Sequence, residues 1–216
     1  MVSTSAEQQL IIDFFHTGAR LDYRKGEFIV GPDEDPRGIF YIESGIVKSY
    51  DITKYGEENL LIIRKEGEII GLTWAITGEP KRILNAAIAP TVVWLVSRPK
   101  FIEFVRTHPE AVLPILDTVT YMYKLHSDRI ITLEYRSVRE RLASFLLSMA
   151  HRFGKKTAKG ITILAPLKQQ DIASSISATR ETTSRALRQL QSHGLISFEQ
   201  SIITITDEKE LAALIS

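Results

Sequence analysis

The chain of 216 residues contains no cysteine, and this absence excludes several kinds of chemistry at once. Disulfides, thiol nucleophiles, thiol redox sensors and cysteine-ligated zinc or iron–sulfur centres all need that residue. Histidine is also scarce, with five in the chain and none between Gly18 and Val96. No cofactor is therefore indicated by the sequence, and an iron–sulfur cluster is excluded.

Long hydrophobic runs are missing as well. The longest strongly apolar run, Ala86 to Val96, contains Pro90 and is about half as long as a membrane-spanning helix. The first ten residues, MVSTSAEQQL, lack the basic segment and apolar core of a secretory signal. We therefore expect a cytoplasmic protein with no membrane partner.

The chain has no overall excess of either charge, with 27 Lys and Arg against 26 Asp and Glu. The two signs are unevenly distributed, however. Residues 137–216 carry 11 basic and 7 acidic side chains, whereas residues 1–136 carry 16 and 19. A basic C-terminal part is typical of a segment that binds a polyanion such as nucleic acid.

Residues 18–96 consist of short apolar or alternating runs separated by turn residues, which predicts an antiparallel sandwich or barrel of short strands. The expected strands are 28–30, 39–42, 46–50, 60–63, 83–88 and 92–96.

Helical spacing replaces this pattern beyond Arg106, and one stripe of residues repeats in alternating steps of four and three. The stripe comprises Val112, Leu116, Val119, Tyr123, His126, Ile130 and Leu133. Such a heptad seam indicates pairing with a second copy of the chain, although packing on its own domain is an alternative. We interpret His126 as a polar residue that fixes the register of the seam. A histidine pair that titrates near neutral pH or binds a metal or haem is the alternative.

Residues 167–190 have the pattern of two short helices joined by a tight turn, followed by a predicted hairpin at 195–198 and 202–205. Thr179 is the expected N-cap of the second helix, at 179–191. Near the N-terminal end of that helix, Arg180, Glu181, Ser184 and Arg185 fall on the face opposite the apolar stripe.

These residue types suit base recognition, because arginine can donate two hydrogen bonds to guanine and glutamate can accept one from cytosine. The N-terminal end of such a helix is the part that enters the major groove. A solvated face of mixed charge is the alternative. The candidate DNA-contacting residues are Lys168, Gln169, Thr179, Arg180, Glu181, Thr182, Ser184, Arg185 and Arg188.

The string SATRETTSR at residues 177–185 resembles the start of the recognition helix in the bacterial family of the cyclic-AMP receptor protein and the fumarate–nitrate regulator. The resemblance extends over the whole chain and implies an α+β fold of three parts. These are a β-roll like that of cyclic nucleotide-binding domains (1–107), a dimerisation helix (108–136) and a winged helix-turn-helix (137–216). It also implies that Arg180, Glu181 and Arg185 read base edges, with Ser184 adding discrimination, on a palindrome whose half-sites lie about one helical turn apart.

The same resemblance implies RNA polymerase as a partner. Residues 153–160 are similar to the family loop that contacts the polymerase, and residues 51–58 to an acidic hairpin loop that contacts sigma factor. The alternatives are attraction of DNA phosphates by the three lysines and a solvated hairpin.

An effector site is implied at Gly71, Leu72, Thr73, Arg82 and Ile83, with His126 and Ser127 of the long helix. Leu72 stands where the family's ribose-binding glutamate is found, and Ile83 where its phosphate-binding serine is found. A leucine would leave the ribose hydroxyl without an acceptor, at a cost of about 1–3 kcal/mol. Cyclic AMP is therefore not the expected ligand, and either another small molecule is the effector or none is needed. Glu68 is expected to be solvated in a turn, and Arg82 to pair with a surface carboxylate or to hold another anion.

The sequence thus predicts a homodimeric DNA-binding transcription regulator that is not an enzyme. A regulator that still responds to cyclic nucleotides through a degenerate pocket is one alternative. A regulatory subunit that binds a cyclic nucleotide and a protein partner is another, but it would not need Arg180, Glu181 and Arg185 on one helical face. A cupin-like enzyme or binding module would require histidines among the strands, and residues 18–96 have none.

Overall fold

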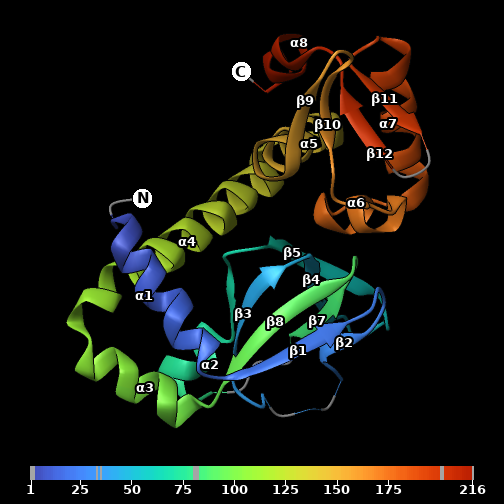
Figure 1. Ribbon diagram of the computed structural model, residues 1–216. Coiled ribbons are helices and arrows are strands. Elements are labelled where there is room, and N and C mark those ends of the chain that lie inside the picture. Colours follow the sequence, from blue (N-terminus) through green and yellow to red (C-terminus); the bar gives the residue numbers. More distant parts are fainter. Residues whose placement is uncertain (1–2, 33, 35, 80–82, 200–201, 216) are drawn as a thin grey trace. The chain divides into compact units, whose positions relative to one another are not determined.

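The computed structural model describes residues 3–32, 34, 36–79, 83–199 and 202–215 (Figure 1). The chain forms two compact units. The first contains residues 1–51 and 61–125, and the second contains residues 52–60 and 126–216.

Two four-stranded antiparallel sheets form most of the N-terminal part. The first sheet has the order β1-β8-β3-β6, with β1 at Ala19–Tyr23, β8 at Thr91–Val96, β3 at Ile39–Ser44 and β6 at Ile69–Ile70. The second has the order β2-β7-β4-β5, with β2 at Phe28–Val30, β7 at Leu84–Ala87, β4 at Ile46–Ile52 and β5 at Glu58–Lys65. The predicted antiparallel architecture is confirmed.

Alternation along the strands of the first sheet places apolar side chains on both of its faces. Phe40, Ile42 and Val93 pack with Ile29 of β2 and Val47 of β4, so that this face of the first sheet meets the second sheet. Residues whose side chains point to the other face of the first sheet, such as Ile39 and Val96, belong to a different cluster.

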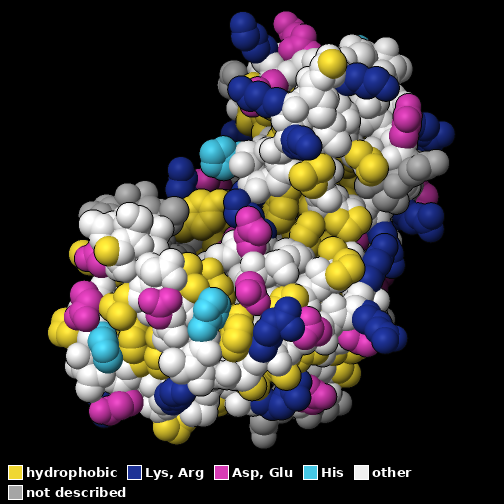
Figure 2. Space-filling model, in the orientation of Figure 1, with side chains coloured by type: hydrophobic (Ala, Val, Ile, Leu, Met, Phe, Trp, Pro, Cys, Tyr) yellow, Lys and Arg dark blue, Asp and Glu magenta, His cyan; other side chains and the backbone are white. Residues whose placement is uncertain are grey.

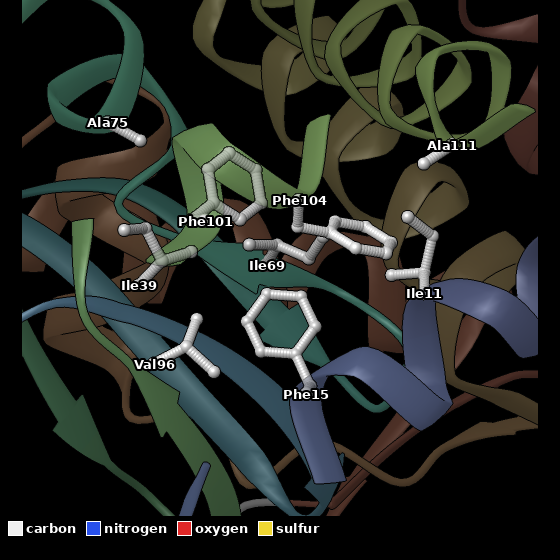
Figure 3. Packing of buried hydrophobic residues seen from close by; sticks show 9 residues of the cluster. All are labelled: Ile11, Phe15, Ile39, Ile69, Ala75, Val96, Phe101, Phe104 and Ala111. Carbon is white, nitrogen blue, oxygen red and sulfur yellow. The ribbon is translucent and has the colours of Figure 1, made fainter. Parts of the chain in front are cut away.

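That second cluster is covered by helices, which are α1 (Ser5–His16), α2 (Leu72–Thr77), α3 (Arg98–Thr107) and the 3₁₀ turn η1 (Pro109–Ala111). Figure 3 shows the rings of Phe15, Phe101 and Phe104 gathered between α1, α3 and the sheet. Phe14 stacks on Phe104 with ring centroids 3.9 Å apart. Thr4 and Glu7 form a reciprocal capping box that fixes the start of α1.

The long helix α4 covers Val112–Tyr135, within the segment where the heptad seam was predicted. Of the residues of α4, only Pro114 in its first turn is buried. Five seam residues are large, exposed apolar side chains: Val112, Leu116, Val119, Tyr123 and Ile130. His126 and Leu133 are partly buried.

The second unit contains the C-terminal helices and a four-stranded sheet. Its helices are α5 (Val138–Phe153), α6 (Gln169–Ser175), α7 (Arg180–Ser192) and α8 (Glu208–Ala213). The sheet has the order β11-β12-β10-β9, with β11 at Ile196–Glu199, β12 at Ile202–Ile205, β10 at Gly160–Ile163 and β9 at Gly154–Thr157. The predicted winged helix-turn-helix is confirmed. Residues 153–160, expected as a loop, instead include strand β9, which pairs with β10.

Among the helices in the described ranges, none combines the length and the apolar character that crossing a membrane requires.

Candidate nucleic-acid interface

The turn between α6 and α7 is short, and its backbone conformation is strained at one residue. Ser177 has φ +49°, the left-handed region in which side chains other than glycine are disfavoured. The N–H of Ala178 donates to the carbonyl of Ala173 at 3.0 Å and closes the turn. Only four residues therefore separate Ser175, the last residue of α6, from Arg180, the first residue of α7.

Hydrogen bonds at Thr179 fix the start of α7. The hydroxyl of Thr179 accepts from the N–H of Thr182 at 3.2 Å, as expected for an N-cap. Its carbonyl accepts from both the N–H and the hydroxyl of Thr183, each at 2.9 Å. Thr183 is fully buried, and Ala186, Leu187 and Leu190 continue this buried stripe along the helix. The face that remains available to a partner is set by this stripe.

The opposite side of α7 carries the predicted base-reading residues. Arg180, Glu181 and Arg185 are exposed, and Ser184 is partly buried. An open hollow of about 560 Å³ lies on this side. The hollow is lined by Gln169, Arg180, Glu181, Ser184, Arg185 and Arg188. Figure 2 shows Lys and Arg side chains along the edge of the C-terminal part on which α7 lies in Figure 1.

The structure therefore brings together six of the nine residues proposed for DNA contact. Of the other three, Thr179 and Lys168 are exposed and Thr182 is partly buried. Lys168 precedes α6, where its backbone N–H donates to the carboxylate of Asp171 at 3.1 Å.

Glu181 is held ionised among cations. Its own backbone N–H and Thr179 provide hydrogen bonds that lower the pKa of the carboxyl group, and the charges of Arg180 and Arg185 act in the same direction. The carboxylate is fully exposed, so it is available as a hydrogen-bond acceptor at neutral pH.

The guanidinium groups of this face make long bonds to α7 itself. Arg185 donates to the hydroxyl of Thr182 and Arg188 to the carbonyl of Ser184, each at 3.4 Å. Bonds of this length are weak, and the two side chains can exchange them for stronger bonds to base edges or phosphates.

The residues expected to hold an effector lie in both units, and Arg82 lies outside the described residues. Gly71 is the N-cap of α2 with φ +94°, and Leu72 begins that helix. The side chain of Leu72 packs against the apolar cluster of Phe15 and Phe101. Thr73 is exposed and Ile83 partly buried. His126 and Ser127 are partly buried residues of the second unit.

The expectation that Glu68 is solvated is wrong. Glu68 is only 6% exposed, because its backbone pairs with β3, where the N–H of Ile42 donates to the carbonyl of Glu68. The carboxylate lies 3.8 Å from the guanidinium of Arg64.

Arg64 is the centre of a polar network that sequence motifs did not reveal. Its Nε donates to the hydroxyl of Ser49 on β4 at 3.0 Å, and that hydroxyl donates to Asn85 on β7 at 2.6 Å. Its Nη1 approaches Met122 Sδ of α4 at 3.7 Å. Along β5, Arg64 falls on the same face as the buried Leu60 and Ile62. A charged residue at this inward-facing position was the sequence signal that could have revealed the network.

Comparison with known proteins agrees with both parts of the fold. Residues 20–108 match the model of the cyclic nucleotide-binding domain, and residues 140–214 match that of the Crp-like helix-turn-helix domain. The chain is 30% identical to a global nitrogen regulator of Synechococcus elongatus over 190 residues, which cover 85% of this chain and 83% of the relative. The chain belongs to the family of the cyclic-AMP receptor protein and the fumarate–nitrate regulator. As a member of this family it is a DNA-binding transcription regulator and not an enzyme.

Two further family members extend the comparison. The fumarate and nitrate reduction regulatory protein of Vibrio cholerae is 26% identical over 191 residues, covering 88% of this chain and 76% of the relative. The solved structure of FixK2 from Bradyrhizobium japonicum is 26% identical and superposes with a TM-score of 0.78, covering 92% of this chain and 98% of that one.

Proposed function

We propose that the protein acts in the cytoplasm as a homodimer that reads a palindromic DNA site with α7 and does not depend on cyclic AMP. The observation that carries this proposal is the exposed face of α7, where three arginines, a carboxylate and a hydroxyl line one hollow with Gln169. These groups are the donors and acceptors that base edges require.

Each group of the hollow has a role in this proposal. Arg180 and Arg185 donate to the O6 and N7 of guanine, and Glu181, ionised at neutral pH, accepts from the N4 amino group of cytosine. Ser184 adds discrimination at the base edges. Contacts to the DNA backbone come from the remaining predicted residues, Lys168, Gln169, Thr179, Thr182 and Arg188.

The exposed side of α4 supports a homodimer. Tyr123 and Ile130 are 72% and 62% exposed, and the other exposed seam residues follow the same heptad spacing. A contiguous apolar stripe of this kind marks an interaction site, and a two-fold seam covers it with an identical stripe. Two copies of α7 related by that symmetry would read the two halves of a palindrome.

Two observations support a response other than to cyclic AMP. Leu72, at the position of the ribose-binding glutamate, packs in an apolar cluster, and Arg64 occupies the inward side of β5. The second candidate, a regulator that retains cyclic-nucleotide sensing through a degenerate pocket, differs in needing the ligand for DNA binding. A different small-molecule effector is also compatible with the fold.

RNA polymerase is the proposed protein partner, contacted through the β9–β10 hairpin. Lys155, Lys156 and Lys159 of this hairpin are exposed. Attraction of DNA phosphates by the same lysines is the alternative.

The test is a selection of the ligand-free protein against random DNA, followed by anisotropy titration of the winning site with and without cyclic AMP. Arg185→Ala is expected to weaken the selected site by about 5- to 150-fold, equivalent to about 1–3 kcal/mol, and to relax specificity at one base pair. Lys155→Ala is the control and should weaken all sequences alike. Equal losses on selected and random DNA for Arg185→Ala would contradict the base-reading role. Tight binding only after cyclic AMP is added would favour the second candidate.

A further inference from the structure

The last turn of α6 is held from outside the helix-turn-helix. Arg129 of α4 donates from Nε to the carbonyl of Ser175 at 3.3 Å. Arg141 of α5 donates from Nη1 to the carbonyl of Ile176 at 3.3 Å, and its Nε donates to the carbonyl of Arg136 at 2.8 Å. Two helices that precede the DNA-binding motif thus bind two successive carbonyls at the end of α6.

These carbonyls are suitable acceptors for a cation. The last carbonyls of a helix have no partner within it and carry a partial negative charge. Arg129 is partly buried, and this burial lowers the pKa of its guanidinium. Acceptors in the protein compensate for the part of the group that is withdrawn from water. At 3.3 Å each of the two bonds is long, so the restraint on this turn comes from the contacts acting together.

A third contact restrains the same turn. The hydroxyl of Ser174 accepts from the N–H of Leu60 at 2.7 Å and donates to the carbonyl of Glu58 at 2.9 Å. Residues 52–60 belong to the same compact unit as α6. Three consecutive residues, 174 to 176, are therefore fixed immediately before the strained turn that leads into α7.

In the sequence of α4, Arg129 lies next to a residue of the predicted dimer seam. It precedes Ile130, which is 62% exposed, and lies between His126 and Leu133. Successive residues of a helix point about 100° apart. In one turn of α4, Ile130 can therefore face the seam while the side chain of Arg129 contacts α6.

We propose that Arg129 is a positioning residue that fixes α6, and with it α7, to α4, so that the spacing between the two recognition helices of the dimer follows from the seam. This inference rests on the proposed function, because it requires a dimer on a palindrome. It assigns Arg129 no contact with DNA.

The experiment measures the preference for half-site spacing, which a residue with a purely structural role would not change. Three duplexes carry the selected palindrome with its original spacing, or with one base pair added or removed between the half-sites. The wild-type protein should prefer the original spacing by about tenfold or more, comparable to the effect of a mismatched base pair. Arg129→Gln should reduce this preference to less than about threefold, whereas Arg129→Lys, which keeps the charge, should restore part of it.

Matched variants separate this effect from others. Arg139 on α5 is exposed, so Arg139→Gln removes the same charge and should keep the wild-type preference. Arg185→Ala should weaken all three duplexes and leave their ratio unchanged. Ser174→Ala removes the third restraint without deleting a charge and should lower the preference in the same direction, which provides a second test if Arg129→Gln does not fold.

Unchanged spacing ratios in folded Arg129→Gln and Ser174→Ala would overturn the inference, even if both bound DNA more weakly. A wild-type protein that selects no palindrome would overturn the proposed function and the inference with it. A selected palindrome combined with an unchanged Arg129→Gln ratio would overturn the inference alone.

Discussion

Replacing Leu116 with alanine tests whether α4 mediates dimerisation. Leu116 is 53% exposed, so about half of its side-chain surface is available to a partner. Complete burial of a leucine contributes about 1.5–3 kcal/mol, and half of that is about 0.8–1.5 kcal/mol for each protomer. Both protomers lose this contribution in a two-fold dimer, about 1.5–3 kcal/mol in total. The dimer dissociation constant should therefore rise by about 10- to 150-fold.

Sedimentation equilibrium over a wide concentration range gives this constant directly. Leu164→Ala is the matched control, because Leu164 is 60% exposed but lies between β10 and α6 and is not a residue of the seam. Alanine has the highest helix propensity, so the Leu116 substitution should not destabilise α4 itself. Equal dissociation constants for the two variants would refute the assignment of the seam, as would a wild-type protein that stays monomeric at every concentration.

Two further predictions concern charges within the protomer. Arg64→Met removes the ion-pair partner of the buried Glu68 and should lower the free energy of unfolding in urea by about 3 kcal/mol, while Arg64→Met with Glu68→Leu should recover most of the loss. A loss below about 1 kcal/mol for the single variant would show that Arg64 does not compensate the buried charge of Glu68. For Glu140, hydrogen bonds from Ser137 lower the pKa of the carboxyl group below its ordinary value of 4.5. The ionised carboxylate therefore stabilises the fold fully above pH 4.5, and this stabilisation is lost as the pH falls through the pKa of the folded state. Glu140→Gln should therefore be less stable than wild type at neutral pH, and this difference should shrink as the pH falls below 4.5. A difference that does not vary with pH would contradict this linkage.

The helix-turn-helix could be predicted from sequence because its signals are local. Thr179 caps the helix that follows it, and the buried stripe of Leu187 and Leu190 repeats at helical spacing within a single element. The exposed face containing Arg180 and Arg185 follows from that stripe without knowledge of the rest of the chain. The heptad spacing of α4 is local in the same way.

Features that depend on distant partners were not predictable in this way. Glu68 is buried because Ile42, far away in sequence, pairs with its backbone. Strand β9 was expected as a loop, since Lys155 and Lys156 give no alternation of apolar and polar residues. Its strand conformation comes from pairing with β10. The contact between Arg129 and Ser175 joins helices separated by α5 and two strands, so no local pattern reveals it.

The two faces of α7 have different consequences for evolution. Thr183, Ala186, Leu187 and Leu190 hold the helix in the domain, whereas the residues that line the hollow have little part in that packing. If these residues read base edges as proposed, substitutions at Arg180, Glu181 or Arg185 will change the preferred DNA site without loss of the fold. A duplicated gene could acquire a new set of target promoters through a few exposed positions while the buried stripe is inherited unchanged.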